Sequence, residues 1–161
     1  MMMTWNEQSY RWMLDAGVYS GYHRELARHL LAHLEPTDEL CDVGCGLGRL
    51  DFELAPHVAG IYAIDQSDYA IKVLQRDVES AGAANIRAHR GVAEELEGVY
   101  DVILLSLFGN PITPELLGHC RRKVIRIVGA STKSGLYPEK HRREVKNAVP
   151  VVKEELARLG E

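Results

Sequence analysis

The sequence has few cysteines and no arrangement of them that suggests a structural framework. Cys41, Cys45 and Cys120 are odd in number, and the first two are spaced more widely than the close CxxC pairs of zinc ribbons. We therefore predict no disulfide framework and no metal site. All three thiols are expected to be buried or nearly buried side chains.

Long hydrophobic runs and an excess of basic residues are also missing. No apolar stretch approaches the roughly 20 residues of a membrane span, and the start, MMMTWNEQSYRW, lacks the layout of a secretory signal. There are 19 Lys and Arg against 23 Asp and Glu, which gives a formal net charge of -4. We therefore expect a cytoplasmic protein with no membrane partner. The charge also argues against nucleic acid as a partner.

Apolar segments alternate with helical patterns from residue 39 onward. Strands are predicted at residues 39–43, 60–65, 85–90, 100–108 and 123–129. Helices are predicted at residues 48–57, 67–82 and 113–122. Strands that alternate with helices at this spacing pair in parallel, so the prediction is a doubly wound, mainly parallel α/β sheet of about five strands.

Helical segments flank this core on both sides within one domain, residues 1–161. Amphipathic helices are predicted at residues 4–15 and 18–36, and residues 1–35 are interpreted as a helical lid over the core at 39–129. A last helical segment, 138–160, should be kinked or divided at Pro150. Ser67 and Gly82 are the predicted caps of the helix between them.

The most informative stretch is ELCDVGCGLGRLDFELA, residues 39–55, where three alternate glycines follow the first strand. In an open α/β sheet the ligand lies beyond the carboxyl ends of the strands, and this turn is where backbone approaches it. Glycine permits positive φ and places no Cβ between chain and ligand. The pattern therefore favours an adenosine-bearing ligand, with a purely structural tight turn as the alternative.

Two acidic residues narrow the choice of ligand. A dinucleotide fingerprint, GxGxxG, would need a third glycine where Arg49 stands, and Asp42 would repel a pyrophosphate while suiting a cationic amino group. Asp65 ends the second predicted strand, where a carboxylate can accept both hydroxyls of a ribose; a helix-capping role is the alternative. Together these features describe S-adenosylmethionine.

LCDVGCGLG, IYAIDQS and YDVILLS give the sequence a resemblance to class I, Rossmann-like S-adenosylmethionine-dependent methyltransferases. The resemblance implies that Asp42 and the turn hold the methionine end and that Asp65 binds the ribose. It also implies that Gln66 flanks the adenine and that backbone after the third strand meets the adenine edge. The cofactor-binding residues predicted on this basis are Asp42, Gly44, Cys45, Gly46, Gly48, Asp65, Gln66, Val92, Ala93 and Ser106.

The sequence departs from the family in two ways. Val92 stands where the family often has an acid that accepts from the adenine amino group, so apolar contacts, backbone or Glu94 must replace it. The family sheet usually has seven strands, and the last two, a hairpin, have no counterpart here. We therefore interpret the sequence as a shortened form, whose exposed fifth strand can support a homodimer.

A methyl group on a sulfonium is already activated, so no catalytic triad is expected, only alignment of a nucleophile for direct SN2 displacement. The candidates for the acceptor pocket are Ser106, Phe108, Asn110, Tyr19 and His23, each of which also has a plain packing or capping explanation. The predicted function is methyl transfer to an unidentified small-molecule or protein acceptor. The alternatives are a methyltransferase-like binding or regulatory module and, third, an NAD-dependent oxidoreductase.

Overall fold

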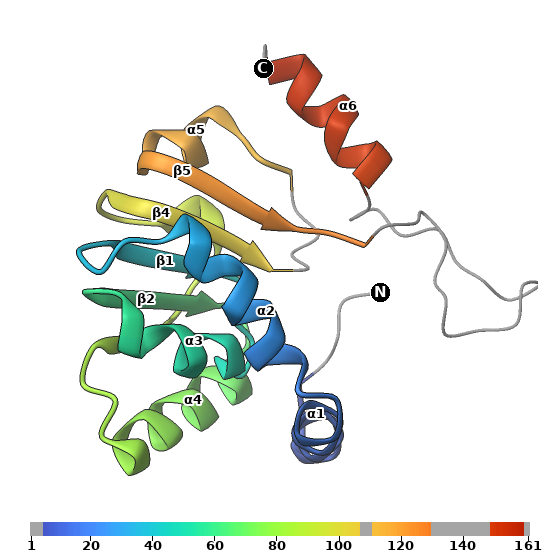
Figure 1. Ribbon diagram of the computed structural model, residues 1–161, viewed down its shortest axis with the longest axis vertical. Coiled ribbons are helices and arrows are strands. Elements are labelled where there is room, and N and C mark those ends of the chain that lie inside the picture. Colours follow the sequence, from blue (N-terminus) through green and yellow to red (C-terminus); the bar gives the residue numbers. More distant parts are fainter. Residues whose placement is uncertain (1–4, 107–110, 130–148, 160–161) are drawn as a thin grey trace, which may run out of the picture.

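The computed structural model describes residues 5–106, 111–129 and 149–159 (Figure 1). Helices α1 (Glu7–Ser20) and α2 (Tyr22–Leu30) precede the sheet, and a 3-10 turn, η1 (Leu31–His33), follows α2. The first helix is longer than the predicted 4–15. Gly21 ends it, because this residue takes the left-handed conformation, with φ of 62°, that glycine adopts without strain.

Five parallel strands form one sheet in the order β3-β2-β1-β4-β5. The strands are β1 (Glu39–Val43), β2 (Gly60–Asp65), β3 (Ile86–Arg90), β4 (Tyr100–Ser106) and β5 (Cys120–Ile127). The predicted α/β sheet is therefore confirmed. The strand order reverses between β1 and β4, so the carboxyl ends of these strands form the switch point at which such sheets bind ligands.

The remaining helices and short turns connect the strands, except α6, which follows the last described strand. They are α3 (Arg49–Leu54) with the turn η2 (Ala55–His57), α4 (Asp68–Ala81), the turn η3 (Ala93–Glu95), α5 (Pro114–Gly118) and α6 (Val149–Leu159). Both predicted caps of α4 are confirmed. The Ser67 hydroxyl accepts from the Ala70 N–H at 3.2 Å, and Gly82 is left-handed with φ of 65°.

Several predicted boundaries were wrong. The helix predicted at 18–36 is divided, because residues 18–20 belong to α1 and α2 spans Tyr22–Leu30. The helix predicted at 113–122 ends at Gly118, and β5 begins at Cys120 instead of residue 123. The arginines after Cys120 are typical of a helix carboxyl terminus, but here the segment pairs with β4, beginning opposite Tyr100. Pro150 is the second residue of α6, where the first turn tolerates proline without a kink. The rest of the predicted final segment, 138–148, lies outside the described residues.

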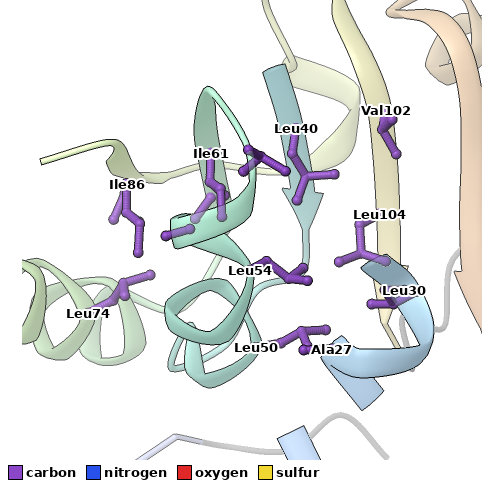
Figure 2. Close-up of a cluster of buried hydrophobic side chains, with 14 of the residues drawn as sticks. Ala27, Leu30, Leu40, Leu50, Leu54, Ile61, Leu74, Ile86, Val102 and Leu104 are labelled. Atoms are coloured by element: carbon purple, nitrogen blue, oxygen red, sulfur yellow. The ribbon is translucent and has the colours of Figure 1, made fainter. Parts of the chain in front are cut away.

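Two apolar layers enclose the sheet, because successive strand residues point to opposite faces. Figure 2 shows the larger layer, in which α2, α3 and α4 pack on the strands. Leu40, Leu54 and Ile61 are completely or almost completely buried there. The opposite face carries Cys41, Ile103 and Leu105 and is covered by side chains from η3, α5 and α6. The helices on both faces confirm the doubly wound architecture.

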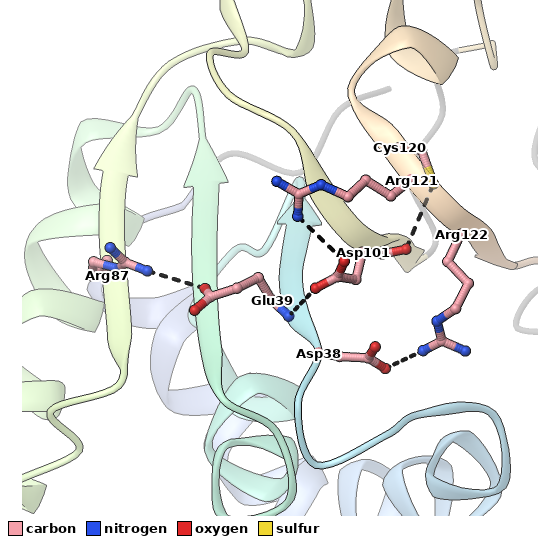
Figure 3. A network of polar contacts seen from close by, with 7 residues as sticks. All are labelled: Asp38, Glu39, Arg87, Asp101, Cys120, Arg121 and Arg122. Atoms are coloured by element: carbon pink, nitrogen blue, oxygen red, sulfur yellow. Dashed lines mark hydrogen bonds and ion pairs between the residues drawn. The ribbon is translucent and has the colours of Figure 1, made fainter.

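A polar network joins four strands near their amino ends (Figure 3). The Glu39 N–H of β1 donates to Asp101 of β4 at 2.9 Å, and the Glu39 carboxylate pairs with Arg87 of β3 at 3.1 Å. Asp38, only 3% exposed, accepts from the Glu35 N–H at 2.7 Å and pairs with Arg122 of β5. Ion pairs and hydrogen bonds thus stabilise the amino ends of these strands. A ligand site is expected at the opposite, carboxyl ends.

The Asp38–Arg122 pair supports a stability prediction. Replacing Arg122 with Met should lower the free energy of unfolding by ~1–3 kcal/mol, because it leaves a buried carboxylate without its charged partner. Arg121→Met is the matched control: its side chain is 56% exposed, and its loss should cost at most ~0.5 kcal/mol. Urea denaturation of the three proteins measures both values. Equal effects of the two substitutions would contradict a structural role for the Asp38 pair.

Candidate cofactor site

The predicted site residues meet at the carboxyl ends of neighbouring strands. Asp42 is the fourth residue of β1, Asp65 is the last residue of β2, and Ser106 is the last residue of β4. The turn after β3 joins this group, because the Gly91 N–H donates to the Asp65 carbonyl oxygen at 3.1 Å. Segments that are distant in the sequence therefore form one edge of the sheet at its switch point.

The glycine turn between β1 and α3 has an unusual backbone. Gly44, Gly46 and Gly48 all have positive φ, at 82°, 55° and 63°. A residue with a Cβ pays roughly 1–2 kcal/mol for this conformation. The turn is also tied to β2, because the N–H groups of Gly44 and Cys45 both donate to the Ile64 carbonyl oxygen, at 2.8 and 3.1 Å. Its shape is thus fixed by the chain itself.

Side chains of the protein fill the space beside two of these glycines. A Cβ on Gly46 would lie 2.9 Å from the indole ring of Trp5, and a Cβ on Gly48 would lie 2.4 Å from a methyl group of Leu74. From the sequence, we expected glycine at these positions because a Cβ would obstruct a ligand that approaches the turn. The structure adds close packing by Trp5 and Leu74 as a second reason.

Asp65 is held in place by the backbone on both sides. Its Oδ2 accepts from the Gly46 N–H at 2.9 Å and its Oδ1 accepts from the Ser67 N–H at 2.8 Å. The acid therefore does take part in capping the start of α4, which was the alternative to ribose binding. Each carboxylate oxygen can accept a second hydrogen bond, so the two roles are compatible. The contacts fix the orientation in which Asp65 meets a ligand.

Asp42 and Asp51 form a buried acidic pair beneath the turn. Asp42 is 2% exposed and points to the α3 face of the sheet, like Leu40 two residues before it; Asp51 of α3 is 0% exposed. Burial, and then the neighbouring Asp51 charge, raise the pKa of Asp42 well above its ordinary value. Burial raises the pKa of Asp51 to about 7. At neutral pH the pair therefore retains a proton.

The cysteines of this region are not reactive thiolates. Burial raises the pKa of the Cys45 thiol, and the nearby acids Asp51 and Asp42 raise it further. Burial likewise raises the pKa of Cys41. All three cysteines are free, with Cys41 buried and the other two half-buried. In the described part of the chain, no group of three or more His, Cys, Asp and Glu residues is arranged to hold a metal ion.

The residues predicted near the adenine lie at the adjoining strand ends. Gln66 is exposed, and its carbonyl oxygen accepts from Arg90 Nε at 3.3 Å. Val92 is 36% exposed just before η3, which begins at Ala93. An apolar side chain is therefore accessible where the family often has an acid, in line with the sequence.

The lid candidates are less closely grouped. Tyr19 is 95% exposed at the end of α1, whereas His23 is half-buried on α2, where burial and the Arg49 charge lower its pKa. Phe108 and Asn110 lie outside the described residues. Among the residues that the structure places, Trp5 is the aromatic side chain that packs on the glycine turn at Gly46.

Trp5 and Asp51 are the two residues near the site that sequence reasoning missed. Asp51 did carry a signal: it lies four residues after Leu47 and three before Leu54, both buried, so it interrupts an apolar helical stripe. Trp5 carried none, because its contact with Gly46 joins parts of the chain that only the fold brings together.

No helix among residues 5–106, 111–129 and 149–159 is long and apolar enough to cross a membrane. In a comparison with protein families, residues 34–131 match a model described as a methyltransferase domain. The matched region contains the five strands, the glycine turn and Asp65.

Individual relatives agree with this match. The chain is 27% identical over 100 residues to a probable cobalt-precorrin-6B C(15)-methyltransferase (decarboxylating) of Methanococcus maripaludis, covering 62% of this chain and 55% of the relative. The chain thus spans about half the length of the curated relatives it matches. A precorrin 8w decarboxylase of Methanobacterium thermoautotrophicum is similar in structure, with a TM-score of 0.53, 25% identity, and coverage of 63% of this chain and 61% of that one.

The magnesium protoporphyrin IX methyltransferase of Synechocystis, solved with bound S-adenosylhomocysteine, shares the fold with a TM-score of 0.65. The two chains are 21% identical, and the superposition covers 86% of this chain and 73% of the Synechocystis chain. The fold and the glycine turn define the class of Rossmann-like S-adenosylmethionine-dependent methyltransferases. This chain belongs to the methyltransferase domain family. S-adenosylmethionine, the cofactor predicted from the sequence, is the methyl donor of that family.

Proposed function

We propose that this chain transfers the methyl group of S-adenosylmethionine to a small-molecule acceptor by direct displacement. The observation that carries the proposal is the acidic end of β1, where Asp42 and Asp51 lie beneath a left-handed glycine turn. An anionic floor favours a ligand with an ammonium and a sulfonium group, and it repels the pyrophosphate of a dinucleotide. This feature argues against the oxidoreductase alternative.

The residues present fit this cofactor. Asp42 and the turn Gly44–Gly48 would hold its methionine end, Asp65 would bind the ribose, and Gln66, Val92 and Ala93 would border the adenine. The cofactor supplies an electrophilic methyl group, whose bond to sulfur breaks as the acceptor bond forms, with the electron pair passing to sulfur. The task of the chain is to orient the two reactants and to exclude water.

The acceptor side is proposed to include Ser106, Phe108, Asn110, Tyr19 and His23. His23 is the titratable group among them whose pKa is lowered, so it is neutral and able to accept a proton at neutral pH. Because the curated relatives are named for cobalt-precorrin-6B, we propose a tetrapyrrole-derived acid as the first acceptor to test. A protein acceptor is the other candidate class.

A turnover assay tests the proposal. The purified chain is incubated with S-adenosylmethionine and either a tetrapyrrole acid such as cobalt-precorrin-6B or a panel of proteins, and release of S-adenosylhomocysteine is measured. We expect release that depends on the tetrapyrrole acceptor and is reduced in Asp65→Ala. Methyl transfer to a protein alone would contradict the small-molecule assignment. Binding of cofactor without transfer to any acceptor would instead favour a binding module.

The edge strand β5 supports a proposal about assembly. Among the described strands β5 pairs only with β4, and Val124, Ile125 and Ile127 are half-buried along it. A strand edge that has no partner among the described strands can pair with a second copy. We propose a homodimer through β5, which light scattering would report as twice the 18.0 kDa chain mass. A monomer at high protein concentration would contradict it.

A further inference from the structure

The acidic pair beneath the glycine turn lacks the partners that buried carboxylates normally have. No N–H or O–H group of the described residues donates to Asp42 Oδ1 or to either oxygen of Asp51. A buried carboxylate without a donor is costly. Two neighbouring carboxylates that are both buried and lack donors repel each other when both are ionised, so the pair is stable only when one of them carries a proton. The arrangement is therefore a carboxyl–carboxylate pair.

Among the residues that the structure describes, the groups that face the pair offer no positive charge. β1 contributes the Cys41 thiol, the turn contributes the Cys45 thiol, and the tip of β2 contributes Asp65. Helix α4 places the apolar side chain of Leu74 beside Gly48 and Asp51.

The nearest candidate cation in the sequence is turned to another partner. Arg49, at the start of α3, forms its ion pair with Asp77 of α4. Within the described residues, the negative charge of the pair is thus left for a ligand to balance.

We infer that Asp51 is a positioning residue for the cofactor: with Asp42 it holds one shared proton while the site is empty and releases it to solvent when cationic S-adenosylmethionine binds. This inference rests on the proposed function. The ligand brings positive charge to the turn above the pair, which favours the doubly ionised form. Asp51 acts through Asp42 and the turn, because it is itself completely buried.

Methyl transfer reverses the effect. S-adenosylhomocysteine has a neutral sulfur and so one positive charge fewer than the donor, which weakens the electrostatic support for the doubly ionised pair. The pair then takes a proton back from solvent. Asp51 thereby makes the site distinguish the donor from the spent product by charge, and the distinction becomes smaller as the pH falls.

Titration calorimetry in two buffers with different ionisation enthalpies counts the protons exchanged on binding. The amino group of the cofactor itself titrates near pH 8, so the readout is the difference between proteins. At pH 7 the wild type should release roughly half a proton more than Asp51→Asn on binding S-adenosylmethionine. Glu53→Gln, the same acid-to-amide kind of change on the same helix, should match the wild type. The excess should be smaller with S-adenosylhomocysteine.

The outcomes are distinguishable. Equal proton release by wild type and Asp51→Asn, with both binding S-adenosylmethionine, would overturn the inference and leave the proposed function standing. Failure of wild type and Glu53→Gln alike to bind S-adenosylmethionine would overturn both.

A measurement on the unmodified chain covers the case in which Asp51→Asn does not fold. A raised pKa means that the native state holds more protons than the unfolded state, so stability is complete at low pH and is lost as the pH rises through about 7. The melting temperature of the unliganded chain should therefore fall by several degrees, roughly 2–4 °C per kcal/mol, between pH 6 and pH 8. Saturating S-adenosylmethionine should reduce this fall. A melting temperature that stays constant or rises over this range would overturn the inference.

Discussion

Gly48→Ala is expected to destabilise the fold by ~2–5 kcal/mol, the largest loss of stability that we predict for a single methyl group. Two costs add at this position. Left-handed backbone strains any residue with a Cβ, and the new methyl group would lie 2.4 Å from a methyl group of Leu74, which is fully buried in close-packed surroundings and would have to shift. Urea denaturation followed by circular dichroism measures the effect.

Gly82→Ala separates the two costs. Gly82 has φ of 65°, almost the 63° of Gly48, but nothing lies within 4 Å of the position of its Cβ. This substitution should therefore cost only the ~1–2 kcal/mol of backbone strain. Equal losses at the two positions would mean that α4 does not pack on the turn as described.

Asp65→Ala should weaken S-adenosylmethionine binding by ~1–3 kcal/mol, or about 5- to 160-fold in dissociation constant. The ribose hydroxyls would lose their acceptor, and the Gly46 N–H would lose the carboxylate that now orients the turn. Titration calorimetry gives the dissociation constants. Asp68→Ala is the control, since Asp68 lies close by in the first turn of α4, the helix that follows β2, but pairs with Lys72 on the surface. An unchanged affinity in Asp65→Ala would remove the ribose assignment.

The parts of the fold that follow from local pattern were predictable. The bounds of β1 and β2 match the sequence prediction, because each is a short apolar run between turn signals. Both caps of α4 were also legible, since capping depends on residues that are adjacent in the chain. The glycine turn follows β1 and Asp65 ends the neighbouring strand β2, as predicted.

Features that depend on tertiary contacts were not predictable. The Arg-rich start of β5 resembles a helix end until its pairing with β4 is known. Trp5 reaches Gly46 across more than forty residues, and the pairing of Asp42 with Asp51 depends on how α3 docks on β1. The acid at position 51 was visible in the sequence, but a single polar residue in an apolar stripe does not reveal its partner.

In our proposal, the negative charge of the site determines which ligand it binds. Asp42, Asp51 and Asp65 surround the turn after β1, and in the described residues Arg49 is paired with Asp77. Such a site stabilises a cation at low dielectric and disfavours a pyrophosphate. We propose that these acids adapt to a sulfonium cofactor the kind of glycine-rich turn that binds dinucleotides in other sheets.

The most direct test is a calorimetric titration of the purified chain with S-adenosylmethionine, S-adenosylhomocysteine and NADH side by side. The acidic turn predicts micromolar binding of the first two ligands, tighter for the cationic donor at pH 8 than at pH 6, and no binding of NADH. Binding of NADH in preference to S-adenosylmethionine would contradict the assignment of the site.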